Sequence, residues 1–109
     1  MTIEEKIDVL KSELSAFLET FRFKLNTDEL RAEVESGINQ RLADFAGDNA
    51  NRIINCMCEC DAENNTDDTI DNNKLVADVY LDVADDDDHS SHGLRHTVKL
   101  RLTLGPTGA

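Results

Sequence analysis

The 109-residue sequence has little of what most binding and catalytic proteins use. It has no tryptophan, one tyrosine and one proline, and aromatic residues make up 5% of the chain, which leaves little material for a deep apolar ligand pocket. Basic residues are also scarce: 11 Lys and Arg stand against 23 Asp and Glu, for a net charge of −12. Nucleic acids and anionic membranes are bound through clustered cations, so the composition argues against both partners.

Long apolar segments are missing as well. No apolar run approaches the roughly 18 residues that a membrane-spanning helix requires. The first five residues, Met-Thr-Ile-Glu-Glu, are acidic, whereas a signal peptide begins with a basic segment. We therefore expect synthesis in the cytoplasm, and the length predicts one domain with a modest core.

The chain opens with an amphipathic segment. Residues 2–25 are expected to form a helix that begins with a Thr2-x-x-Glu5 capping box. Its apolar residues recur every three or four positions, at Ile3, Ile7, Leu10, Leu14, Phe17 and Phe21. Such a stripe packs either on the chain's own core or on a partner subunit, and the sequence leaves both alternatives open.

A second helix is expected from Asn26 to about Ala46. Asn26 and Glu29 have the spacing of a capping box, and Gly47 is the residue type that most often follows a helix end. Gly37, inside this helix, costs about 1 kcal/mol relative to alanine, so its presence predicts close packing against a neighbour.

The apolar period then changes to two, which predicts strands over residues 52–60, 74–84 and 94–104. Their inward faces are expected to hold Ile54, Cys56, Cys58 and Cys60; Leu75, Ala77, Val79, Leu81 and Val83; and Leu94, His96, Val98, Leu100, Leu102 and Leu104. Asp78 and Asp82 lie on the other face of the second strand, and Arg95, Lys99 and Arg101 on that of the third. Opposite charges favour cross-strand pairing, so these two strands are expected to be neighbours.

The predicted fold class is α+β: two helices followed by a small three-stranded, mostly antiparallel sheet. We expect residues 1–25 to form an amphipathic helix with a role as an intersubunit arm. Residues 26–104 are expected to form the α+β domain, and residues 105–109 a flexible tail because they are rich in Gly and Pro.

The cysteines follow a Cys56-x-Cys58-x-Cys60 pattern. Neighbouring cysteines on one strand face are about 7 Å apart, too far for a disulfide, so we expect small buried side chains, with an intersubunit disulfide as the alternative. Two other segments hold residues that could bind a metal ion: His89, His92 and His96 beside four aspartates, and the acidic loop 61–72. The loop lacks the glycine and the glutamate of a calcium-binding EF-hand. The sequence carries no catalytic motif, so we expect neither an enzyme nor a cofactor.

A series of short motifs resembles a known family. Residues 58–66, Cys-Glu-Cys-Asp-Ala-Glu-Asn-Asn-Thr, precede Ile-Asp-Asn-Asn at 70–73 and an apolar strand, Leu-Val-Ala-Asp-Val-Tyr-Leu, at 75–81. Before them come Asn26-Thr27, Ile38-Asn39 and Leu42. In this order the elements resemble the C-terminal domain of the tail sheath proteins of contractile-tailed bacteriophages. The resemblance covers roughly residues 26–83.

The resemblance implies a structural virion protein of a contractile tail, made in the host cytoplasm. It would assemble with sheath or other tail proteins, and into a homo-oligomeric ring or helix, by sharing β-strands. Because full sheath proteins carry hundreds of residues before this domain, we expect a small tail protein, such as a sheath initiator of the baseplate or a neck terminator. The expected interface residues are Ile3, Ile7, Leu10, Leu14, Phe17, Phe21, Arg95, Lys99 and Arg101.

Two other functions fit parts of the sequence. Residues 61–88 hold eleven acidic residues and one lysine, as in a small adaptor or inhibitor that binds a basic protein. The histidines and aspartates would also suit a metal-storage or metal-sensing domain.

Overall fold

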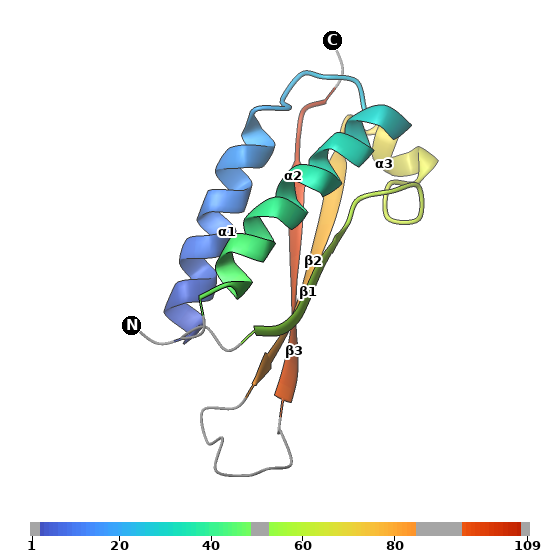
Figure 1. Ribbon diagram of the computed structural model, residues 1–109. Helices are drawn as coiled ribbons and strands as arrows, with labels where there is room; N and C mark the ends of the chain where they lie inside the picture. The colour runs from blue at the N-terminus through green and yellow to red at the C-terminus, as the bar shows by residue number, and fades with distance from the viewer. Residues whose placement is uncertain (1–2, 49–52, 85–94, 108–109) are drawn as a thin grey trace.

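A computed structural model describes residues 3–48, 53–84 and 95–107 of the chain. Its elements are α1 (Ile3–Glu19), α2 (Asp28–Ala46), β1 (Ile53–Glu59), α3 (Asp67–Asp71), β2 (Leu75–Ala84) and β3 (Arg95–Leu104). The strands form one antiparallel sheet in the order β1-β2-β3, and α1 and α2 lie on the same side of it (Figure 1). The predicted α+β fold is confirmed.

Helix α1 is shorter than predicted. It ends at Glu19, and residues 20–23 continue in tighter turns until Phe23, whose φ is 70°. The Thr20 hydroxyl donates to the Phe17 carbonyl at 2.7 Å, a local bond that competes with helical pairing. The helix therefore ends before Phe21, the last residue of the predicted apolar stripe, although Phe21 is still buried in the core.

Helix α2 ends where predicted, but its N-cap lies one residue later than the prediction. Thr27, not Asn26, caps the helix, because its side chain accepts a hydrogen bond from the Leu30 amide at 3.1 Å. Asn26 instead donates to the Lys74 carbonyl at 2.9 Å and so ties the start of α2 to the start of β2. The helix ends at Gly47 as expected, with Gly47 in the right-handed rather than the left-handed conformation.

The close packing predicted at Gly37 is present. A Cβ atom at this position would overlap the ring of Phe17 on α1. The guanidinium of Arg41, one turn further along α2, lies 3.9 Å from the centre of the same ring. The missing side chain at Gly37 thus lets α1 approach α2 closely.

The central strand β2 has the predicted inward face. Leu75, Ala77, Val79 and Leu81 are fully buried and pack against α1 and α2. On β3, Leu102 and Leu104 are buried while Val98 and Leu100 are only partly covered. The helices therefore cover the sheet fully at one end of β3 and incompletely towards its start.

The predicted phase of β1 is wrong at its beginning. Cys56, Cys58 and Cys60 do face the helices, but Ile54 is 45% exposed and Ile53 packs against the core instead. The pairing with β2 shifts between Ile53 and Asn55, as in a β-bulge. An extra residue in one strand reverses which side chains before it face the core. The predicted alternation of inward and outward residues therefore holds only from Cys56 onward.

The short helix α3 was not predicted. Thr66 caps it by accepting a hydrogen bond from the Thr69 amide at 3.3 Å, and the five-residue helix lies within the polar segment between β1 and β2. Local bonds from Asn and Asp side chains shape the rest of this segment, as expected for turn residues. For example, Asn64 accepts from the Asp61 amide at 3.0 Å.

The first three residues of the expected flexible tail are held in place. The Thr107 amide donates to the Asn73 carbonyl at 2.8 Å, and the Thr107 side chain is buried. The Pro106 carbonyl accepts from the Phe23 amide at 3.2 Å, and Arg22 donates to the Gly105 carbonyl. Residues 105–107 thus fasten the end of β3 to the segment between α1 and α2.

Candidate functional site: the sheet edges and the outer face

Side chains of α2 close one edge of the sheet. The Cys58 amide donates to Oδ1 of Asn39 at 2.9 Å, and the Cys60 amide donates to Oε1 of Glu35 at 3.1 Å. Two strand residues span about 6.6 Å and four helix residues about 6 Å, so positions i and i+4 of α2 match alternate amides of β1. These amides would otherwise face away from β2 and be free to pair with another chain. The C-terminal half of β1 is therefore capped.

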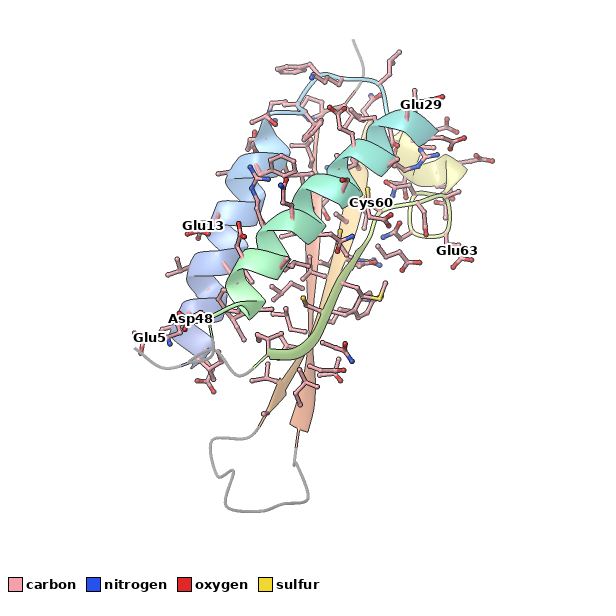
Figure 2. All side chains as sticks on the ribbon, viewed as in Figure 1. Glu5, Glu13, Glu29, Asp48, Cys60 and Glu63 are labelled. Carbon is pink, nitrogen blue, oxygen red and sulfur yellow. The ribbon has the colours of Figure 1, made fainter. Side chains whose placement is uncertain are left out.

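The cysteines of β1 serve packing. Cys58 and Cys60 are each 2% exposed, and Figure 2 shows Cys60 close to α2 at the end of β1. Burial, together with nearby Glu35 and the neighbouring thiol, raises the pKa of Cys58 to about 12; burial and Glu35 raise that of Cys60 to about 12. Both remain protonated thiols at neutral pH, and thiolates are the reactive and metal-binding form. All three cysteines are unpaired.

The opposite edge, β3, has no such cap. Among residues 95–104, the structure gives no hydrogen bond between the backbone and any group outside the sheet. Thr97, Lys99, Arg101 and Thr103 are exposed, and Val98 and Leu100 are partly so. A ten-residue strand with an unpaired edge is a template on which another strand can pair.

The sheet face turned away from α1 and α2, the outer face, carries three cross-strand rows. They are Asn55–Asp82–Thr97, Met57–Tyr80–Lys99 and Glu59–Asp78–Arg101. In the third row Arg101 donates twice to Asp78, from Nε to Oδ1 at 2.8 Å and from Nη2 to Oδ2 at 3.0 Å. These bonds, helped by one from Asn64, hold the pKa of the Asp78 carboxyl below its usual range despite its burial. The pairing of Arg101 with Asp78 fits the predicted cross-strand charges.

Asn65 is a structural residue that sequence reasoning did not single out. Its Oδ1 accepts from the Val76 amide and its Nδ2 donates to the Val76 carbonyl, both at 2.8 Å, although it is 2% exposed. Its amide therefore pairs with β2 as a strand residue would, at the point where β1 has ended. The Asn-Asn-Thr motif contained the signal, since a buried amide needs several partners.

The expected interface residues of α1 lie in this chain's own core. Ile7, Leu10, Leu14 and Phe21 are buried, and Ile3 and Phe17 pack against them. A further core residue, Leu18, was missed because it lies beside the a/d stripe. The role of this helix at a subunit interface stays a prediction.

The three basic residues of β3 that were expected at an interface have different surroundings. Arg101 is held by Asp78, and the Lys99 ammonium lies 5.5 Å from the centre of the Tyr80 ring. Arg95 lies opposite Ala84 in the register, and its side chain is outside the described residues.

The described residues contain neither a metal-binding cluster nor a helix that could span a membrane. His89, His92 and the aspartates at 85–88 lie outside the described residues, as does the side chain of His96. Within residues 3–48, 53–84 and 95–107, no three His, Cys, Asp or Glu side chains gather as a metal site would require. The described helices are each too short or too polar to cross a bilayer.

Comparison with known proteins gives one finding. The family model described as phage tail sheath C-terminal domain matches residues 2–86. The match begins before α1, so the helix expected to precede the family region falls within it. Searches of the curated proteins and of the solved structures found no match. Because the match covers more than half of the chain, the protein belongs to the phage tail sheath C-terminal domain family, a structural domain of bacteriophage tails.

Proposed function

We propose that this protein is a virion component of a contractile tail that engages sheath or sheath-like subunits by accepting a strand on the edge of β3. The observation that carries the proposal is the difference between the two sheet edges. Amides of β1 bond to Asn39 and Glu35, while the backbone of β3 has no partner beyond β2 among the described residues. Strand addition uses such a free edge and draws its strength from main-chain hydrogen bonds.

The side chains of β3 define the strand that would fit. Its exposed Thr97, Lys99 and Arg101 alternate with the half-covered Val98 and Leu100. A partner strand therefore needs apolar residues facing the helices, where they would complete the cover of Val98 and Leu100, and polar residues on the outer face. Acidic residues at the polar positions would suit Lys99.

The family membership supports a role in the tail, and the proposal includes the place of the protein there. A baseplate sheath initiator or a neck terminator must present one sheath-like edge to the first or last sheath ring. Strand pairing lets such a joint survive movement of the subunits, since the hydrogen bonds connect backbones and not surface side chains. We infer a ring of copies at one end of the sheath.

Deuterium exchange of the assembled particle tests this proposal. Compared with the purified full-length chain, amides within residues 95–104 should exchange more slowly in the particle. The matched control is the Cys58 and Cys60 pair, whose amides are already bonded and should change little. New protection along β1 with none along β3 would overturn the proposed edge.

A further inference from the structure

Phe23 adopts a conformation that its side chain does not favour. Its φ of 70° lies in the left-handed region, where a bulky residue is an outlier and glycine is the usual choice. The core gains little from the ring, which is 61% exposed, whereas Phe21 two residues earlier is buried. Strained residues cluster at functional sites, so we looked for a contact that the exposed ring could make outside this domain.

Phe23 is part of a small apolar protrusion. Leu25 is 63% exposed, the highest value among the large hydrophobic residues that the structure describes, and Lys24 lies between the two. No acidic residue occurs from 20 to 27, although the chain carries −12 overall. The Lys24 ammonium lies 5.4 Å from the Phe21 ring and has no carboxylate partner among the described residues. We call residues 23–25 the tip.

A hollow of about 280 Å³ lies on the outer face of the sheet, lined by Asn55, Cys56, Met57, Tyr80 and Asp82. Met57 is opposite Tyr80 and Asn55 opposite Asp82, so two cross-strand rows form its floor. Met57 is 52% exposed. Thr97 donates to Oδ1 of Asp82 at 2.6 Å, and Oδ2 of Asp82 has no partner among the described residues.

We propose that the tip of one copy inserts into the hollow of a second copy of this chain. A cavity of about 150 Å³ holds benzene, so the hollow has room for the Phe23 ring. Met57 and Tyr80 offer sulfur and aromatic contacts to that ring. The free oxygen of Asp82 is the complementary partner for the unpaired Lys24 ammonium, with Asn55 available beside it.

The two halves of this contact lie on different parts of the molecule. The tip follows α1 at the end of the helical layer (Figure 1). The hollow is on the sheet face turned away from the helices. A contact between different patches of identical chains is heterologous and repeats from copy to copy, which produces a ring or a helix. This inference uses the outer face and does not depend on strand addition at β3.

Phe23→Gly separates association from folding. In the full-length chain, this variant should unfold at the same temperature as the parent or higher, because glycine relieves the left-handed strain. Its self-association, measured by sedimentation over a concentration series, should weaken at least tenfold, about the loss expected for a buried aromatic anchor. Val9→Ser is the control: Val9 is 47% exposed on α1, and its replacement should leave association unchanged.

Charge reversal tests the assigned partner. Lys24→Asp and Asp82→Lys should each weaken association, and a mixture of the two variants should associate better than either alone because the pair is restored across the contact. A parent chain that stays monomeric at its solubility limit would overturn the proposal. So would a mixture with no rescue, which would mean that the tip binds elsewhere.

Discussion

At the residue scale, polar side chains form hydrogen bonds with backbone groups of the strands that no neighbouring strand reaches. Asn39 and Glu35 occupy amides of β1, and Asn65 pairs with both backbone groups of Val76. None of these roles follows from periodicity, because each joins residues from different elements. The choice of Thr27 over Asn26 as N-cap has the same origin, since Asn26 is engaged by Lys74 and Asn65. Sequence reasoning placed Asn26 at a helix start and Asn65 in a turn but could not name their partners.

Asn65→Ala should be among the most destabilising polar substitutions in the chain. It leaves the amide and the carbonyl of Val76 buried without partners, at a cost of about 2–6 kcal/mol for the two groups together. Urea denaturation measures the loss. Asn72→Ala removes one exposed bond to the Asp68 carbonyl and should cost about 1 kcal/mol or less. Equal losses in the two variants would contradict the role given to Asn65.

The buried thiols should make the fold sensitive to alkali. Burial raises the pKa of Cys58 and Cys60 to about 12, above the value of about 8.5 for a free thiol. Between these values the folded state holds more protons than the unfolded one. The contribution of the thiols to the free energy of unfolding is therefore fully present below about pH 8.5 and is lost as pH rises towards 12. The slope is at most about 1.4 kcal/mol per pH unit for each thiol.

Denaturation at pH 8, 9 and 10 measures this slope. The Cys58→Ala, Cys60→Ala double variant should be less stable at pH 8 because it loses packing, but its stability should change less from pH 8 to 10. Parallel pH dependences in parent and variant would show that the thiols are not the groups responsible.

At the element scale, the sequence predicted which elements form but not what each one packs against. The stripe of α1 was recognisable, yet amphipathicity shows only that one face is buried. The structure buries Leu10 and Leu14 in the chain's own core. The predicted inward position of Ile54 is wrong because of a bulge in β1. Ile53 and Ile54 are both apolar, so the sequence pattern does not show which of them faces the core. Helix α3 is a single polar turn, too short to have an apolar period.

Leu14→Ala tests the packing of α1. Leu14 is fully buried, so its truncation should cost about 2–5 kcal/mol of unfolding free energy in the full-length chain. Val9→Ala, on the exposed side of the same helix, should change stability by about 0.5 kcal/mol or less. A Leu14→Ala protein as stable as the parent but unable to assemble would instead make α1 the intersubunit arm that the sequence pattern also allowed.

At the scale of the whole molecule, charge and strand pairing act at different stages. Acidic side chains stand out from both helices and from the loop before α3, as Figure 2 shows for Glu13, Glu29 and Glu63. A charge of −12 repels like chains in solution and slows premature association. Main-chain bonds along β3 would be shielded once formed, while exposed ion pairs are screened within about 3 Å in 1 M salt.

If the proposal holds, β3 is the edge on which this protein joins the tail. Electron cryomicroscopy of native particles, kept in 1 M NaCl before freezing, tests it most directly. We expect the protein to stay on the particle and an extended segment of another subunit to run alongside residues 95–104, with Asn39 and Glu35 still bonded to the β1 amides. A particle that loses the protein in salt, or a strand of another subunit lying along β1 with none along β3, would show that β3 is not the joining edge.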